Sequence, residues 1–308
     1  MGRKRRGRAV HGWMVIDKPA GMTSAAVVGK ARRLTGAAKV GHGGTLDPLA
    51  TGVLPLAFGE ATKTVAWAMD GAKVYRFTVR WGEARATDDA EGAVTATSDA
   101  RPTIEEIASV LPRFIGDIDQ VPPAYSAVKV SGKRAYALAR DNQPVDLPPR
   151  SVIIHRLELI GAPDADHAQF EAETGKGAYM RSLARDLAVA VGTVGHIEKL
   201  RRTRVGPFAK EDAISLEKLA ALGHSAPLAD YLLPVETALD VIPALVLTEV
   251  EARRLQRGQP LPVLPVASRS PLTDIAQGAV VCAMAEGRLV ALARIRGGEI
   301  WPLRVLNV

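Results

Sequence analysis

The chain of 308 residues has little cysteine, few aromatic residues and no long apolar run. Its single cysteine, Cys282, excludes an intramolecular disulfide and a cysteine-rich metal site. Cys282 lies in an apolar, strand-like run, which predicts a buried and unreactive thiol. No stretch of 18 apolar residues occurs, so we expect no transmembrane helix. No apolar segment follows the basic N-terminus, which argues against a signal peptide and favours a cytoplasmic protein.

The charge is positive but unevenly distributed. The formal net charge is +7, which favours an acidic partner such as nucleic acid. The basic segment from Arg3 to Arg8 supplies five positive charges and leaves about +2 for the rest. An RNA-binding body must therefore gather its basic residues on one face.

Local patterns divide the chain into three parts. Residues 1–10 are predicted to be a disordered basic arm, 11–240 a catalytic domain, and 241–308 a small β-rich module. The period-two alternation from Lys73 to Trp81 predicts a strand. Strands are also expected at 10–17, 51–58, 152–159, 168–173, 279–285, 289–296 and 300–306, and helices at 25–34, 61–69, 102–114, 131–140, 178–191, 214–222 and 248–257.

The most informative segment runs from Gly41 to Gly52 and surrounds Asp47 with glycines and one proline. Glycine allows close backbone approach to a ligand, and proline stiffens the turn. Taken locally, an Asp before Pro is a turn residue that caps its own backbone. The acidic loop at 85–92 suggests a metal site at first sight, but no other residues with ligand spacing lie near it, so we expect a solvated loop.

Further segments appear in a fixed order around Asp47. They are Val15–Ser24, Glu60–Lys63, Lys73–Phe77, Val121–Val130, Gly132–Tyr136, Tyr179–Leu187 and Lys199–Thr203. In this order the chain resembles the bacterial tRNA pseudouridine synthase B family, from about Trp13 to about Phe208 and more weakly to the C-terminus. The departures are small: Gly43 stands where many relatives carry Thr, and Thr45 where some carry Ala.

The resemblance implies a fold and a reaction. The fold is α+β, a pseudouridine synthase fold with a mixed, mainly antiparallel sheet flanked by helices, followed by a small barrel-like PUA module that binds RNA. The reaction isomerises the T-loop uridine at position 55 of tRNA to pseudouridine. It needs no cofactor and no metal, because no redox change occurs and no group leaves. The partner is the T-arm stem-loop of tRNA, and we expect a monomer that needs no protein partner.

The resemblance also assigns roles to residues. Asp47 is the catalytic carboxylate, which attacks the uracil or the ribose or assists a glycal intermediate. Arg181 is its ion-pair partner, with a fork suited to a bidentate contact. Tyr75 stacks on the flipped uracil and presents its hydroxyl near C5.

The remaining candidates concern binding. His42 enters the space that the flipped base leaves, Leu200 lines the uracil pocket, and Lys18 supports the loop around Tyr75 or the RNA backbone. Tyr179 belongs to the same matched segment as Arg181 and is predicted to contact the substrate. Predicted phosphate contacts are Lys63, Lys129, Arg134, Arg201, Arg202 and Arg204.

Each residue also has an ordinary structural interpretation. Tyr75 and Leu200 fit core positions, His42 an exposed loop position, and Arg181 the surface of an amphipathic helix. At the level of the chain, one alternative is a non-catalytic RNA-binding or RNA-folding protein on the same scaffold. Another is the related catalytic subunit of guide-RNA particles, which the absence of a long Lys-rich C-terminal tail argues against.

Overall fold

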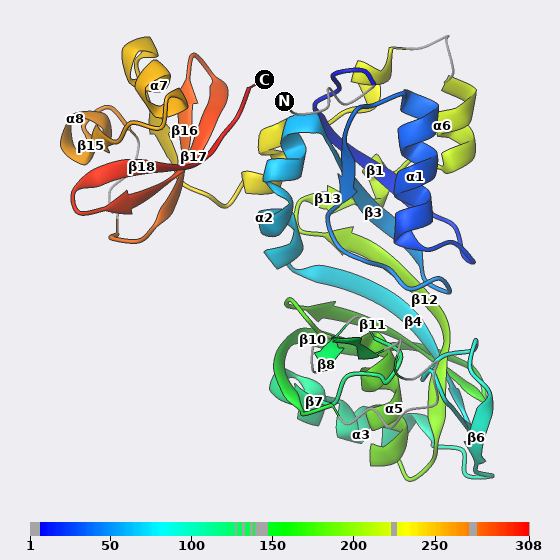
Figure 1. Ribbon diagram of the computed structural model, residues 1–308. Coiled ribbons are helices and arrows are strands. Elements are labelled where there is room, and N and C mark those ends of the chain that lie inside the picture. Colours follow the sequence, from blue (N-terminus) through cyan, green and yellow to red (C-terminus); the bar gives the residue numbers. More distant parts are fainter. Residues whose placement is uncertain are drawn as a thin grey trace.

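The computed structural model describes residues 7–126, 128–130, 133–135, 138, 147–222, 227–270 and 276–307. These residues form a large sheet with helices and, at the C-terminal end, a smaller sheet beside it (Figure 1). Within the described part of the chain, no helix combines the length and the hydropathy that crossing a membrane requires.

The large sheet has nine strands and is mainly antiparallel. Its order is β1-β3-β12-β4-β11-β10-β7, with β13 paired to β12 and β2 to β3. The strands are β1 (Gly12–Lys18), β2 (Val40–His42), β3 (Thr51–Phe58), β4 (Lys73–Trp81), β7 (Gly116–Gln120), β10 (Arg150–Asp164), β11 (His167–Thr174), β12 (Gly195–Val205) and β13 (Phe208–Ala209). Strands β3 and β12 run parallel, so the sheet is mixed, as predicted.

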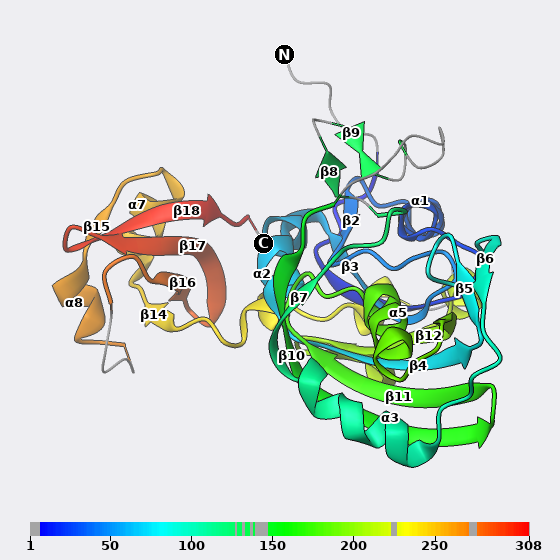
Figure 2. The same ribbon diagram turned by 90° about the horizontal axis from the view of Figure 1, so that it is seen from below.

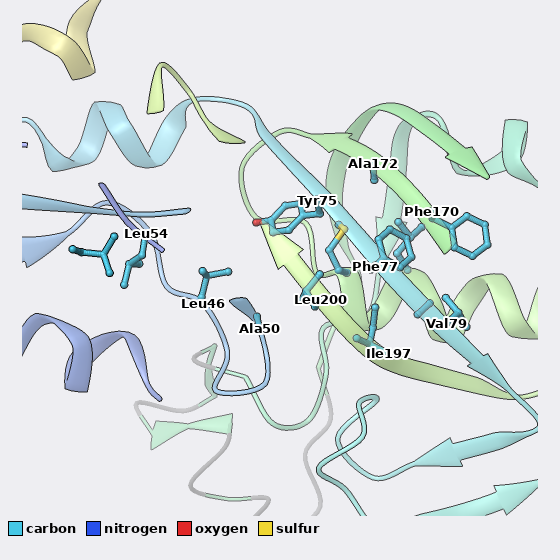
Figure 3. Close-up of a cluster of buried hydrophobic side chains, with 14 of the residues drawn as sticks. Leu46, Ala50, Leu54, Tyr75, Phe77, Val79, Phe170, Ala172, Ile197 and Leu200 are labelled. Atoms are coloured by element: carbon cyan, nitrogen blue, oxygen red, sulfur yellow. The ribbon is translucent and has the colours of Figure 1, made fainter. Parts of the chain in front are cut away.

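Strand β4 confirms the alternation expected from the sequence. Tyr75, Phe77 and Val79 are buried in one hydrophobic cluster. Phe77 stacks on Phe170 of β11, with 5.3 Å between ring centroids (Figure 3). Because strand side chains alternate between faces, Arg76 points to the opposite side, where it pairs with Glu171.

Helices flank both faces of the large sheet. They are α1 (Ser24–Thr35), α2 (Val65–Asp70), α3 (Ile104–Val110), α5 (Met180–Ala190) and α6 (Leu216–Leu222), with short 3₁₀ helices η1 (Gly59–Lys63), η2 (Leu111–Phe114), η3 (Lys210–Asp212), η4 (Leu228–Tyr231) and η5 (Val235–Leu239). Helix α1 begins as predicted, because the Thr23 side chain accepts a hydrogen bond from the Ala26 N–H. It ends at Gly36, whose φ of 64° few other residues adopt. Figure 1 shows α1 beside β1 and β3, and α5 beside the other half of the sheet.

Two short hairpins complete this part, β5 (Glu83–Arg85) with β6 (Val94–Thr97) and β8 (Lys129–Val130) with β9 (Lys133–Arg134). The helix predicted for residues 131–140 is wrong at 133–134, because these residues pair with 129–130 instead. Ala135 and Leu138 are helical, and the rest of that interval lies outside the described residues.

The predicted N-terminal arm overlaps residues that the structure describes. Arg8 pairs with the turn after α1: its N–H donates to the Gly36 carbonyl at 2.8 Å, and its carbonyl accepts from Ala38 at 2.9 Å. Disorder through residue 10 is therefore wrong from Arg8 onward, because backbone pairing orders this stretch. Residues 1–6 lie outside the described part.

The second sheet is formed by residues 244–305. Its order is β14-β16-β17-β18-β15, with strands β14 (Ala244–Val246), β15 (Leu261–Pro262), β16 (Val280–Ala285), β17 (Arg288–Arg296) and β18 (Glu299–Val305). Helix α7 (Glu249–Gln256) starts at a capping box of Thr248 and Glu251, and α8 (Val263–Ala267) follows. This half-barrel arrangement fits the expected PUA-like module (Figure 2).

The C-terminal module shares an apolar cluster with the large sheet and the helices beside it. Trp13 and Phe208, with ring centroids 4.9 Å apart, belong to the same cluster as Leu292 and Cys282 of the C-terminal module. Burial raises the pKa of the Cys282 thiol to about 12, in agreement with the predicted inert cysteine.

Lys63 takes part in this docking. Its ammonium donates to the Val305 carbonyl at 2.7 Å and pairs with Glu60 at 2.6 Å. Glu60 in turn accepts a hydrogen bond from the Asn307 N–H. Lys63 was predicted to contact phosphate. Its partners lie within the protein because the C-terminal module covers this position.

Candidate active site

Asp47 lies in the loop between β2 and β3, with its side chain about one-third exposed. The residue before it, Leu46, is buried and held by Ser24 of α1 in two directions. The Ser24 hydroxyl donates to the Leu46 carbonyl at 3.0 Å and accepts from the Leu46 N–H at 2.8 Å. Because both backbone groups next to Asp47 are paired, the carboxylate is held in place while remaining accessible.

Lys18 contacts the loop that carries Asp47. Its side chain is fully buried, and the ammonium donates to the carbonyls of Pro19, Met22 and Pro48. Burial lowers the pKa of Lys18 to about 8, although the charge of Asp47 opposes this. Lys18 was predicted to support the loop around Tyr75 or the RNA backbone. In the structure its buried ammonium is instead used by the carbonyls of Pro19, Met22 and Pro48, next to Asp47.

The lowered pKa of Lys18 predicts a pH dependence of stability. Below about pH 8 the residue is protonated in both the folded and the unfolded chain. Between about pH 8 and the ordinary 10.5, the unfolded chain still binds the proton that the folded chain has lost, so the folded state gains stability as the pH rises. We expect the free energy of unfolding of wild type, relative to K18M, to increase from pH 7.5 to pH 10 in urea titrations. A constant difference would mean that Lys18 titrates alike in both states.

Arg181, the second residue of α5, reaches Asp47. Its side chain is 4% exposed, and Nε donates to Asp47 Oδ2 at 2.9 Å. Nη1 donates to the Thr87 carbonyl at 2.8 Å and Nη2 to the Tyr125 carbonyl at 3.0 Å. The ion pair is present as predicted, but the bidentate geometry is wrong, because the two Nη atoms are used by backbone carbonyls.

Asp89 is a residue of this site that the sequence reasoning missed. Its carboxylate lies 3.7 Å from Arg181 Nε and accepts hydrogen bonds from the Thr87 hydroxyl and the Glu91 N–H. Asp89 is 3% exposed, so the expected solvated loop is wrong at this position. The three acids of the loop were visible in the sequence, but their burial depends on α5, which is about 90 residues away.

Two other acids of this loop, Asp88 and Glu91, have carboxyl pKa values that burial raises. Asp88 pairs with Arg185, one helical turn after Arg181, at 2.9 Å. Burial raises the pKa of the Asp88 carboxyl despite this partner. Burial also raises the pKa of Glu91, and the nearby charges of Asp89 and Asp47 act in the same direction.

Tyr75 and Leu200 line the sheet beside this loop. Tyr75 is 9% exposed and Leu200 is 7% exposed, so both also serve the core, as their ordinary interpretation predicted. Figure 3 shows the Tyr75 ring near Leu200, with its hydroxyl directed toward the loop that carries Leu46. Tyr179, just before α5, is half-buried; burial raises the pKa of its hydroxyl, and the charge of Asp47 adds to the effect.

Arg202 has a different position from the one predicted. It is 1% exposed, and its guanidinium donates to the carbonyls of Val53, Gly44 and Thr45. A buried guanidinium whose donors are used in this way does not reach a phosphate. Arg202 instead holds the backbone of Gly44 and Thr45, just before Asp47.

His42 lies on β2 next to that loop and is half-buried. In the described structure its Nδ1 is buried without a hydrogen-bond partner. Burial lowers the pKa of His42, and the charge of Arg202 lowers it further. The imidazole is therefore neutral at pH 7 and suited to contact a base rather than a phosphate.

The other predicted phosphate contacts are either paired or undescribed. Arg201 forms two hydrogen bonds with Asp17 at 3.0 and 2.8 Å, and Arg204 pairs with Glu173 at 2.6 Å. The side chains of Lys129 and Arg134 lie outside the described residues. Among the residues that the structure describes, no group of three or more His, Cys, Asp or Glu could hold a metal ion.

Comparison with solved structures defines the class of protein. The structure superimposes with a TM-score of 0.75 on a chain in the crystal structure of a Cbf5-Nop10-Gar1 complex, at 26% identity, covering 97% of this chain and 84% of the other. A chain in the structure of an H/ACA RNP bound to a substrate RNA containing 2′-deoxyuridine also gives 0.75, at 22% identity, covering 100% and 92%. The fold is that of the pseudouridine synthases, which are isomerases.

Sequence comparison identifies the family. Residues 32–180 match the N-terminal domain of the TruB family pseudouridylate synthases, and residues 181–240 match the tRNA pseudouridylate synthase B C-terminal domain. A curated tRNA pseudouridine synthase B from Rhodospirillum rubrum is 60% identical over all of both chains. One from Caulobacter sp. strain K31 is 51% identical, also over both full lengths. The chain belongs to the TruB family, which confirms the resemblance noted in the sequence.

Proposed function

We propose that this protein converts the uridine at position 55, in the T loop of tRNA, into pseudouridine. The observation that supports it best is the partly exposed Asp47 carboxylate, held by the buried Arg181 at 2.9 Å. Full-length relatives at 50–60% identity are named tRNA pseudouridine synthase B, which supports tRNA as the substrate.

The proposed chemistry uses groups of this chain alone. The N-glycosidic bond between C1′ and N1 of uracil breaks, the base rotates, and C1′ bonds to C5. The C5 proton leaves and N1 gains a proton, so the atoms balance without an oxidant or a co-reactant. Asp47, which Arg181 holds through a hydrogen bond from Nε, supplies the negative charge or the nucleophilic oxygen for this exchange.

The flipped base needs a pocket. Extruding the uridine costs a few kcal/mol, which stacking and shape complementarity offset. We assign Tyr75 and Leu200, which share a cluster with Leu46, to one wall of this pocket. In this proposal the Tyr75 ring stacks on the uracil, and its hydroxyl accepts the C5 proton while it releases its own to solvent. We assign His42, whose pKa burial lowers, to the space that the base leaves in the T loop.

We further propose that the chain acts as a cytoplasmic monomer without a protein partner. The supporting observation is that the Arg181 guanidinium that pairs with Asp47 at 2.9 Å belongs to the same chain, so this ion pair needs no second subunit. Sedimentation of the protein during turnover tests this: activity confined to a larger species would contradict it.

The test of the function compares two tRNA transcripts. One carries the natural T loop, and in the other the uridine at position 55 is replaced by cytidine. We expect carbodiimide-dependent primer-extension stops at position 55 in the first transcript and none in the second. Binding of both transcripts without any stop would contradict the proposal and favour a non-catalytic RNA-binding protein.

A further inference from the structure

Gln120, the last residue of β7, makes two hydrogen bonds with the backbone of one distant residue. Its Oε1 accepts from the Tyr179 N–H at 2.9 Å, and its Nε2 donates to the Tyr179 carbonyl at 3.3 Å. Gln120 is 1% exposed. The side-chain amide therefore pairs with a peptide unit as a neighbouring strand would, in a place that water does not reach.

Tyr179 is the residue from which α5 starts, and no side chain caps the helix there. Arg181 follows two residues later. The Gln120 amide thus contacts both polar groups of the residue that precedes the first turn of α5, and the Tyr179 carbonyl also accepts the helical bond from the Leu183 N–H.

The segment that follows Gln120 strengthens this connection. The Val121 carbonyl accepts from the Ser182 hydroxyl at 2.7 Å and from Arg185 Nη2 at 2.9 Å. The Tyr125 carbonyl accepts from Arg181 Nη2. Hydrogen bonds thus connect the end of β7 and the residues after it to the first turns of α5. Among these residues, Gln120 is the one that bonds to the backbone at the start of the helix.

We propose that Gln120 is a positioning residue for the isomerisation: by holding the backbone of Tyr179 it places the Arg181 guanidinium on Asp47. This inference rests on the function proposed above. Gln120 touches neither substrate nor Asp47 and acts through Tyr179 and Arg181. Its effect should be large, because a misplacement of about 1 Å in a catalytic group can cost on the order of 100-fold in rate.

The experiment compares Q120M with T193V. Q120M keeps the volume of the side chain and removes both hydrogen bonds. Thr193 is a matched control, since it is 6% exposed and its hydroxyl donates to the Ala100 carbonyl at 3.0 Å, just beyond the other end of α5. T193V removes that bond and keeps the shape. Wild type, Q120M and T193V are assayed side by side on tRNA, and their thermal unfolding is recorded.

We expect kcat of Q120M to fall by about 10- to 100-fold, with KM for tRNA within about threefold of wild type. For T193V both constants should stay within about threefold, while the two variants lose similar amounts of thermal stability. Equal kinetic losses in the two variants, or a loss confined to KM, would overturn the positioning role. If Q120M does not fold, Q120N replaces it, because an amide one methylene shorter does not reach both groups of Tyr179.

A crystal structure of the same variant provides a test independent of turnover. The distance from Arg181 Nε to Asp47 Oδ2, 2.9 Å in the wild type, should lengthen. An unchanged distance would overturn the inference. If the wild type forms no pseudouridine, the proposed function is wrong. The Arg181–Asp47 distance in Q120M still tests whether Gln120 positions Arg181, because it is measured without turnover.

Discussion

The D47N variant is expected to bind tRNA within about threefold of wild type and to isomerise uridine at least ~10³-fold more slowly. An Asn at this position still accepts the hydrogen bond of Arg181 Nε through its amide oxygen. It carries no negative charge and is not a nucleophile, so geometry is kept while the chemistry is removed. Single-turnover release of tritium from C5-labelled tRNA measures the rate, and filter binding measures the affinity.

The structure offers a matched control for this substitution. Asp88 also pairs with an arginine of α5, Arg185, at 2.9 Å. Its φ of 57° suits Asn as well as Asp, so D88N introduces no backbone strain. We expect D88N to retain turnover within about tenfold. If D47N retains as much turnover as D88N, Asp47 takes no part in the reaction.

The second large effect is expected for R181K. Arg181 donates in three directions, to Asp47, Thr87 and Tyr125, and a lysine ammonium on a different stem does not reproduce this fork. Carbonyls left unpaired in a buried site cost stability, and Asp47 loses its fixed partner. We expect kcat to fall by about 10²- to 10³-fold, with tRNA affinity within about fivefold. Steady-state kinetics and binding measurements separate these two effects.

R185K is the control for this prediction. Arg185 lies one turn further along α5 and is more exposed, with a side chain 29% accessible. Its ion pairs with Asp88 and Asp186 are partly accessible and do not include Asp47, so we expect less than about fivefold loss of turnover. An R181K rate equal to that of R185K would mean that the Asp47–Arg181 pair does not serve catalysis.

Together these variants separate an enzyme from an RNA-binding protein. Loss of turnover with retained binding in D47N and R181K supports the isomerase. A wild type that binds tRNA without forming pseudouridine, with unchanged binding in both variants, would support the non-catalytic alternative.

Local patterns in the sequence predicted most elements of the fold. The alternation in β4, the Thr23 cap of α1 and the helix after Thr248 depend on residues a few positions apart. Interactions of this range are encoded in the sequence itself, because strand and helix periodicities follow from backbone geometry. The helix expected at 131–140 was wrong where 133–134 pair with 129–130, since strand pairing overrode helix propensity.

The candidate site was predicted by resemblance rather than by pattern. Asp47 and Arg181 are 134 residues apart, and no periodicity links them. The motifs that carry the resemblance identified both residues correctly as a pair. They did not show that the guanidinium contacts Asp47 through Nε alone, since the partners of its other nitrogens are backbone carbonyls of distant loops.

By itself the sequence determined the class of this protein, its family and the order of most helices and strands, and its resemblance to the family led to Asp47 as the proposed catalytic carboxylate. Only the tertiary structure decided which charges are buried. Lys18 and Arg202 hold the Asp47 loop, Lys63 docks the C-terminal module, and Asp89 joins the ion pair of Arg181. The physical reason is that burying a charge is favourable only when distant parts of the chain supply its partners, and composition and spacing do not contain that information.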